Sequence, residues 1–304
     1  MNEAANANPE SQTDLHWRDA MLDALPDSET VRRFISEYET VRIHEGRGNL
    51  DDDALRSLPW PASADPFAWE WYIRSQSFEH LRSQFLPRFL ATRGDLPEFA
   101  HGGGLRILDL GAGVGWLSYR MALDGHRPVA VDLSGHPRVG LGAASAYTEA
   151  LERPFPRWLA HFDHLPAADA SADLLIYNAS FHYSADYAST LNEALRCLAP
   201  LGAIVIMDTP IYRDAAAGAQ MVEERKAAFE ARYGFASSAL ESREFLTYAQ
   251  VDALAETLDL RWANHRPKRG WSWTWHRLRR RWKTGRPSAE FAFLVATRSA
   301  DVGA

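Results

Sequence analysis

Two patterns of hydrophobic and polar positions divide the chain. Over 27–46, apolar residues recur at intervals of three and four, which predicts an amphipathic helix with Ser28 or Asp27 as its N-cap. A second helical pattern covers 66–92, and Pro87 inside it predicts a kink or a split. The turn-rich stretch between these two patterns predicts an ordered loop.

Beyond residue 104, short apolar runs alternate with helical patterns. The runs that predict strands cover 105–110, 127–132, 157–161, 173–178, 203–208, 258–264 and 290–297. The other patterns predict helices over 115–124, 138–151, 186–198, 217–233 and 247–258. Continuous apolar runs are typical of parallel strands buried on both faces, so the sequence predicts a doubly wound α/β sheet. A ligand binds such a sheet at the carboxyl ends of its strands, where the strand order reverses.

Composition narrows the class of protein. The 304 residues are 46% hydrophobic and 24% charged, which is ordinary for a soluble globular protein. No apolar run is long enough to span a membrane, and the polar segment 1–14 lacks the features of a secretory signal and predicts a disordered tail. The single cysteine, Cys197, excludes an intrachain disulfide and a multi-cysteine metal site. We therefore expect a cytoplasmic protein without a metal ion.

Charge is distributed unevenly along the chain. Residues 261–286 contain ten Lys/Arg and no Asp/Glu, which leaves 23 Lys/Arg against 40 Asp/Glu elsewhere. The acidic remainder disfavours general nucleic-acid binding. Four residues of the basic block share one helical face: Trp271, Trp275, Leu278 and Trp282. Three alternatives stay open: this face packs on the body, or 271–286 contacts an anionic membrane or a lipid-linked substrate, or it stacks on RNA.

A glycine-rich turn follows the first of the apolar runs beyond residue 104. Residues 107–118 read ILDLGAGVGWLS, a G-x-G-x-G spacing that differs from the G-x-G-x-x-G of dinucleotide sites. Asp109 precedes the glycines, where it would repel a pyrophosphate and suit an ammonium group. Asp132 ends the next strand and can accept ribose hydroxyls, a feature that S-adenosylmethionine (SAM) and NAD sites share. Asp163, in FDHLP, can accept a hydrogen bond from an adenine amino group.

Five blocks then resemble the class I SAM-dependent methyltransferase family, in order and spacing. They are LDLGAGVG, VAVDLS, FDHLP, DLLIYNASFHY and LNEALRCLAPLGAIVIMD, and they cover about 105–208. The resemblance is greatest to the broad small-molecule group called type 11. It implies a Rossmann-like, mostly parallel sheet of seven strands with an antiparallel last strand. The expected organisation is a helical extension over 15–103 and a SAM-binding domain over 104–298, with a lid-like insert at 209–248 and a basic insert at 265–288.

The resemblance also implies roles for single residues. The expected cofactor contacts are Asp109, Gly111, Gly113 and Gly115 on the amino-acid part, Asp132 on the ribose, Leu133 and Asp163 on the adenine, and Asn178 on the methionine side. In related enzymes a leading segment covers the cofactor, so Arg74 is expected to reach its carboxylate. Asp132 and Asp163 can alternatively be ordinary loop or cap acids, Asn178 can be a turn former, and the glycines can simply form a tight turn.

The expected activity is methyl transfer from SAM to a small molecule by in-line displacement, which needs alignment and exclusion of water. The acceptor, its methylated atom and the oligomeric state stay open. His182, beyond the fourth strand, is the candidate general base, with Tyr183, Asp208 and Tyr212 as weaker candidates. The alternative functions are a nicotinamide-nucleotide-dependent oxidoreductase, a non-catalytic protein that keeps the SAM fold, and an RNA methyltransferase.

Overall fold

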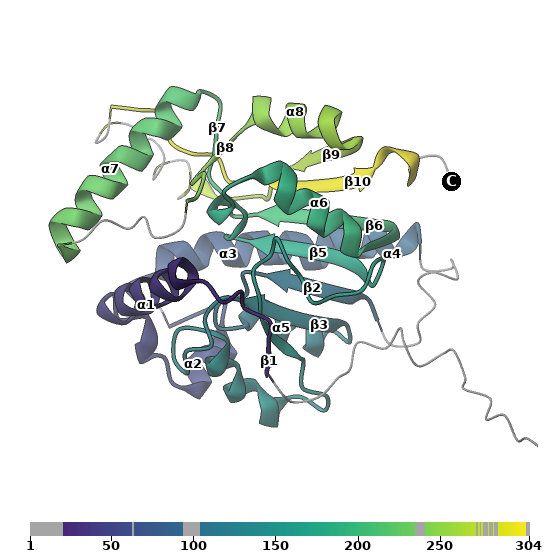
Figure 1. Cartoon of the computed structure of the whole chain (residues 1–304), viewed down its shortest axis with the longest axis horizontal. Coiled ribbons are helices and arrows are strands. Elements are labelled where there is room, and N and C mark those ends of the chain that lie inside the picture. Colours follow the sequence, from purple (N-terminus) through teal and green to yellow (C-terminus); the bar gives the residue numbers. More distant parts are fainter. Residues whose placement is uncertain are drawn as a thin grey trace, which may run out of the picture.

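The protein is an α/β structure built on one large sheet. The computed structural model describes residues 21–62, 64–93, 104–234, 241–271 and 285–301, together with 273, 275, 279 and 282. The tail predicted over 1–14 lies outside these residues. The sheet has eight strands in the order β1-β4-β3-β2-β5-β6-β10-β9. Figure 1 shows helices on both faces of this sheet.

All strands but one run in the same direction. They are β1 (Met21–Asp23), β2 (Arg106–Leu110), β3 (Arg127–Asp132), β4 (Arg157–Leu159), β5 (Ala172–Asn178), β6 (Leu198–Met207), β9 (Leu260–His265) and β10 (Phe293–Arg298). Neighbours from β1 to β6 pair in parallel, whereas β10 is antiparallel to both β6 and β9. The predicted fold class is confirmed, including the antiparallel last strand.

The predicted strand count of seven is wrong by one in this sheet. The additional strand is β1, which pairs with β4 at the sheet edge. Its three residues lie in the region predicted to be helical, and so short a run carries no readable alternation. A separate two-stranded sheet joins β7 (Ile211–Tyr212) to β8 (Leu246–Thr247).

The helices largely follow the predicted pattern. They are α1 (Glu29–His44), α2 (Asp52–Ser57), α3 (Ala68–His80), α4 (Leu86–Ala91), α5 (Trp116–Leu123), α6 (Tyr187–Cys197), α7 (Ala215–Tyr233) and α8 (Tyr248–Leu258). Ser28 caps α1 by accepting from the Val31 amide, and Thr247 caps α8 in a capping box with Gln250. The split predicted at Pro87 is confirmed, because a π-helical segment, Leu81–Phe85, separates α3 from α4.

Two local predictions are wrong. The stretch predicted as a loop between α1 and α3 contains α2 and a 3-10 turn, Arg47–Asn49. Its acids look like turn residues, yet Asp51 caps α2 and the two following acids lie in its first turn, where the helix dipole favours them. The helix predicted over 138–151 is a run of 3-10 turns, Leu141–Ala150.

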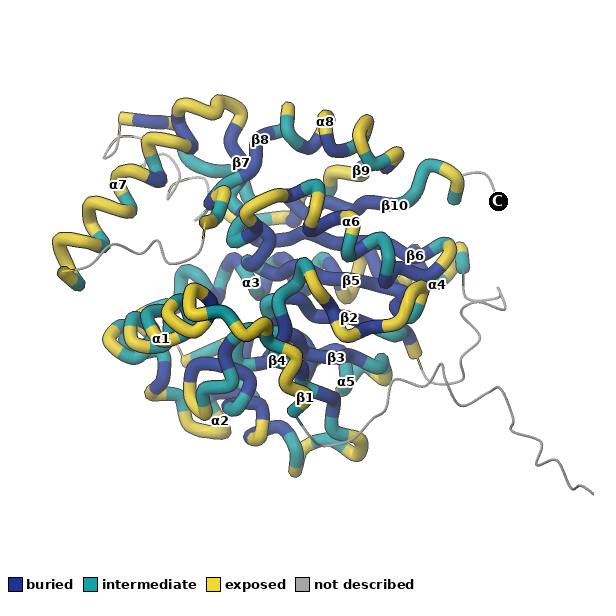
Figure 2. The backbone as a smooth tube through the Cα atoms, viewed as in Figure 1, coloured by how far each residue is buried: buried dark blue, intermediate teal, exposed yellow. Residues whose placement is uncertain are grey.

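Two hydrophobic clusters fill the two faces of the sheet. Along β2, Ile107 belongs to one cluster, whereas Leu108 and Leu110 belong to the other, as alternation along a strand requires. The first cluster packs against α3, α4 and α5, and the second against α6 and α8. Figure 2 shows the central strands buried and the outer surfaces of α1 and α7 exposed. Among the described helices, none combines the length and the apolar stretch that a membrane crossing needs.

An ion pair joins the starts of two central strands. Arg106 donates from its guanidinium to Asp173 at 2.6 Å, and the Arg106 backbone amide donates to the same carboxylate at 2.8 Å. The Asp173 side chain is 0% exposed. This pair fixes β2 against β5, the two strands between which the strand order reverses.

We expect Asp173→Ala to lower the free energy of unfolding by about 3 kcal/mol, because it leaves a guanidinium and an amide without their buried partner. Chemical denaturation measures this loss. Asp169→Ala is the matched control: Asp169 pairs with Arg196 at 2.7 Å but is 80% exposed, and its loss should cost less than about 1 kcal/mol. Equal losses in the two variants would contradict the structural role given to Asp173.

Candidate active site

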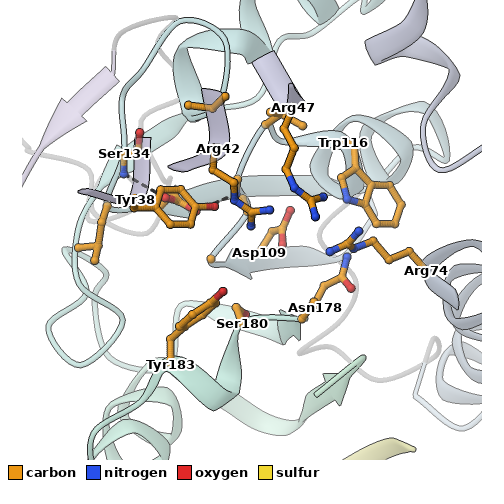
Figure 3. Close-up of a pocket in the computed structure, with 18 of the residues that line it drawn as sticks. Tyr38, Arg42, Arg47, Arg74, Asp109, Trp116, Ser134, Asn178, Ser180 and Tyr183 are labelled. Atoms are coloured by element: carbon orange, nitrogen blue, oxygen red, sulfur yellow. Dashed lines mark hydrogen bonds between the residues drawn. The ribbon is translucent and has the colours of Figure 1, made fainter. Parts of the chain in front are cut away.

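A cavity of about 430 Å³ opens at the carboxyl ends of β2, β3 and β5. This is the edge at which the strand order reverses, and the volume lies in the range of small-molecule sites. The sheet contributes the turn after β2 and the ends of β3 and β5. The helical extension contributes α1, α3 and the segment between them (Figure 3).

The three glycines of the turn after β2 have different tasks. All have positive φ angles, of 75° at Gly111, 58° at Gly113 and 76° at Gly115. A Cβ at Gly111 would lie 2.3 Å from the Ser180 Cβ, so glycine is needed there for close packing. Nothing lies within 4 Å of a Cβ position at Gly113, which lines the cavity. Gly115 does not line it and forms the left-handed N-cap of α5.

Asp109 is a buried carboxylate of which one oxygen is hydrogen-bonded within the described part of the chain. Its Oδ2 accepts from the Ser118 amide at 3.1 Å and from the Ser118 hydroxyl at 2.8 Å. Its Oδ1 is buried and has no hydrogen-bond partner among the residues that the structure describes. Burial raises the pKa of Asp109 to about 7, although the bonds from Ser118 oppose the rise. A cationic ligand group in the cavity would satisfy this oxygen.

Asp132 ends β3 at the cavity wall. Its Oδ2 accepts from the Gly113 amide at 2.7 Å, and its Oδ1 accepts from the Ser134 amide at 3.0 Å. Burial raises its pKa, and these amides partly offset that rise. Each carboxylate oxygen can accept more than one hydrogen bond, so both remain available to a ligand diol. Leu133, the next residue, also lines the cavity.

Asn178 and Arg74 lie at the end of the cavity near Trp116, as Figure 3 shows. Asn178 ends β5, and its Oδ1 is buried without a partner. Arg74 comes from α3 and forms an ion pair with Glu70 at 3.4 Å. Both residues line the cavity, so the structure brings them together with the sheet acids.

The structure does not bring Asp163 to the cavity wall. Its carboxylate accepts a hydrogen bond from the Thr190 hydroxyl and lies 3.6 Å from His161 Nδ1. The neighbouring residues His161 and Phe162 line the cavity instead. The adenine contact expected of Asp163 stays a prediction.

His182 is half-buried and does not line the cavity. Its Nδ1 is buried without a partner. Burial, and to a smaller extent the charges of Arg225, Arg74 and Arg42, together lower the pKa of His182 to about 3. The imidazole is therefore neutral and a weak base at physiological pH.

Of the three weaker candidates for a general base, the structure places one at the cavity and two away from it. Tyr183 lines the cavity. Asp208 does not, because it accepts from the Ser77 hydroxyl at 2.6 Å and pairs with Arg269 at 3.6 Å. Tyr212 is buried elsewhere and accepts from Arg286 at 3.0 Å.

Several cavity residues were not found from the sequence: Arg47, Phe67, Trp116 and Ser180. Arg47 belongs to the stretch predicted as a loop and Phe67 to the helical pattern over 66–92, and neither pattern indicated a ligand contact. Trp116 follows Gly115 directly, and that adjacency could have identified it. Ser180 is recognisable only in space, since it packs on Gly111 and donates to the Leu110 carbonyl.

Comparison with known proteins finds sequence matches to the part of the chain that forms the sheet side of this cavity. A type 11 family model described as "Methyltransferase domain" matches residues 108–206. A curated relative, dimethylglycine N-methyltransferase of Parasynechococcus marenigrum (strain WH8102), is 36% identical over 108 residues. That alignment covers 34% of this chain and 36% of the relative, about a third of its length.

Two solved structures are similar over most of the chain. One is 1,6-didemethyltoxoflavin-N1-methyltransferase of Burkholderia thailandensis, at 17% identity and a TM-score of 0.51, covering 92% of this chain and 94% of that one. The other is magnesium protoporphyrin IX methyltransferase of Synechocystis PCC 6803, at 15% identity and a TM-score of 0.50, covering 88% and 98%. At these identities the likeness shows the fold. Residues 108–206 therefore match the methyltransferase family in sequence, and the chain shares the fold of these two methyltransferases.

Proposed function

We propose that this chain transfers a methyl group from SAM to a small-molecule acceptor. The observation that carries the proposal is the convergence on one cavity of Asp109 with its unpaired oxygen, the open backbone at Gly113 and the carboxylate of Asp132. SAM has an ammonium group, a methionine side chain that must pass close to the protein backbone, and a ribose diol. These three residues match those three features in turn.

The other walls fit the remaining parts of the cofactor. Leu133 and Phe162 offer apolar surface for the adenine, Arg74 offers a cation for the carboxylate, and Asn178 lies on the methionine side. When bound, SAM supplies a methyl group already activated by a positively charged sulfur. A dinucleotide fits less well, because the buried carboxylate of Asp109 would face a pyrophosphate. This contrast disfavours the oxidoreductase alternative.

The acceptor is proposed to carry a negative charge. Figure 3 shows the guanidinium groups of Arg42, Arg47 and Arg74 directed toward the cavity. Arg47 pairs with Glu45 at 2.7 Å and with Glu70 at 2.9 Å.

Arg42 differs from these two arginines. It lies over the ring of Tyr38 at 4.9 Å, and among the described residues it forms no ion pair with a carboxylate. Burial opposes its charge, but Tyr38 and Tyr183 hold its pKa above the usual value. This half-buried cation, whose charge acts on Asp132 and Glu45 without an ion-pair contact among the described residues, is the proposed binding site for an anionic group of the acceptor.

The insert 209–248 is proposed to form a second wall. Ser242, near its end, lines the cavity, and Arg225 of α7 ties to Glu244 at 2.6 Å. Its action as a lid, the division into an extension over 15–103 and a domain over 104–298, and His182 as the base remain predictions. The dimethylglycine, porphyrin and toxoflavin enzymes among the comparisons support a small molecule rather than nucleic acid as acceptor.

Asp132→Ala should weaken SAM binding by about 1.5–3 kcal/mol, because it removes charged hydrogen bonds to the ribose. Isothermal titration calorimetry measures the change, with NAD as a second ligand. Asp53→Ala is the control, since Asp53 is 95% exposed on α2. Unchanged SAM affinity in Asp132→Ala, or binding of NAD in place of SAM by the unmodified chain, would refute this placement of the cofactor.

Asp109→Asn should change how stability depends on pH in the ligand-free protein. Folding raises the pKa of Asp109 from 3.8 to about 7, so the folded state binds more protons between those values. Its contribution to stability therefore falls as pH rises from about 4 to about 7. Between pH 5 and pH 8, the free energy of unfolding of Asp109→Asn should rise relative to that of the unmodified chain by more than about 1 kcal/mol. Chemical denaturation at the two pH values measures this change. Parallel pH profiles would contradict the buried-carboxylate interpretation.

Arg42→Gln should raise the KM for a charged acceptor by about 10- to 100-fold, through loss of a charge-assisted hydrogen bond. The Kd for SAM should change little. Labelled methyl transfer to a panel of carboxylate, phosphate and neutral acceptors supplies the substrate for this measurement. Arg33→Gln is the control, because Arg33 is 67% exposed on the same helix. An equal loss of SAM affinity in Arg42→Gln would assign Arg42 to the cofactor instead.

A further inference from the structure

Three tryptophans of the basic block are unusually exposed. Trp271 is 85% exposed, Trp275 is 68% exposed and Trp282 is 90% exposed. The other large hydrophobic residues on the described surface, Leu22, Trp60 and Leu123, are 42–48% exposed. We call the three residues the tryptophan face. Exposed apolar groups of this size in one place mark an interaction site.

The tryptophan face has a definite direction. Residues 271, 273, 275, 279 and 282 are all helical. At about 100° per residue, Trp271, Trp275 and Trp282 lie within about 40° of one another, whereas Trp273 lies on the opposite side. Trp273 stacks on Trp69 at 5.9 Å and meets Phe291 edge-on at 5.8 Å. Trp273 is therefore the tryptophan that packs on the body, which is one of the expected alternatives. The tryptophan face points away from the body.

The segment is tied to the body on both sides of these tryptophans. At its start, the Gly270 amide donates to the Tyr72 hydroxyl at 3.2 Å. At its end, the buried Arg286 pairs with Glu224 at 3.0 Å and donates to Tyr212 at 3.0 Å. The tryptophan face is thus presented between two fixed points, on α3 and on α7.

The charge around the tryptophan face indicates what kind of partner it binds. Residues 271–286 contain six Lys/Arg and no Asp/Glu, and Arg279 is exposed beside the tryptophan face. Arg266 and Lys268, just before it, are exposed as well. The remainder of the chain is strongly acidic. An anionic surface would attract the basic block and repel the body, which orients the protein with the tryptophan face toward that surface.

We infer that the tryptophan face docks on bilayers that contain anionic phospholipids. Tryptophan favours the interface between headgroups and acyl chains, and exposed Lys/Arg strengthen binding near an anionic membrane. The face projects from a helix rather than lining a groove, which suits a soft, flat partner. The inference extends beyond methyl transfer and does not depend on it.

The helix that holds the docking segment also contributes to the cavity wall. The helix α3 holds the basic segment through Trp69 and Tyr72, and the same helix lines the cavity through Trp71 and Arg74. The cavity and the docking surface therefore share one rigid element.

Sedimentation of the full chain with vesicles tests the inference. The chain should bind vesicles of phosphatidylcholine with about a third phosphatidylglycerol, bind pure phosphatidylcholine weakly, and be largely released by salt of about 0.5 M. Replacing the tryptophan face by serine (W271S, W275S and W282S together) should lower the partition coefficient by about tenfold or more. L123S, which removes an exposed apolar group on α5, should leave it unchanged.

Thermal unfolding is the check that the triple variant folds, and W282S alone should also lower binding. Equal binding by the triple variant would overturn the inference. Absence of binding to anionic vesicles would overturn it as well. If size-exclusion chromatography then showed a dimer that the triple variant loses, the face would be an interface between copies. If the chain bound RNA instead, the face would be a nucleic-acid surface.

Discussion

The reversal of strand order between β2 and β5 is the constraint on which the site depends. The chain passes from β2 to β3 and β4 on one side and from β5 to β6 on the other, so no connection covers the carboxyl end between β2 and β5. The turn after β2 is fixed on both sides of this gap. Its Gly111 and Ala112 amides donate to the Val131 carbonyl at 2.8 and 2.9 Å, and Ser180 packs on Gly111. Asp109 and Asp132 are therefore held in place by the sheet before any ligand binds.

Opposite charges line opposite sides of the cavity. The acids come from the sheet, inside the segment 108–206 that matches the methyltransferase family. The arginines come from α1, α3 and the segment between them, outside that match. A zwitterionic cofactor fits between the two sides with its ammonium toward the sheet. The proposed anion site at Arg42 therefore lies in the added helices, outside the segment that the family model matches.

The sequence predicted the elements that carry a strong local signal. Apolar runs located the central strands, and Ser28 and Thr247 marked helix starts because a cap acts on residues three positions away. Elements with little local signal were missed: β1 is too short to alternate, and the acids that cap α2 look like a turn. The same limit applies to the site. Asp109 and Asp132 follow from motif spacing, whereas Arg47 and Ser180 reach the cavity through tertiary contacts. For the basic segment, periodicity found the tryptophan face but could not say which side packs.

The arginines also bear on how the acceptor reacts. Burial lowers the pKa of His182 most. The charges of Arg42 and Arg74 at the cavity and of Arg225 on α7 lower it as well. Arg42 and Arg74 also line the cavity, where their charges would lower the pKa of an ammonium group of an acceptor beside them. An amine acceptor would then be held in its neutral, nucleophilic form, and an acidic hydroxyl would ionise more readily. Because the environment itself favours loss of the proton, methyl transfer at this site does not require His182 to act as a strong base.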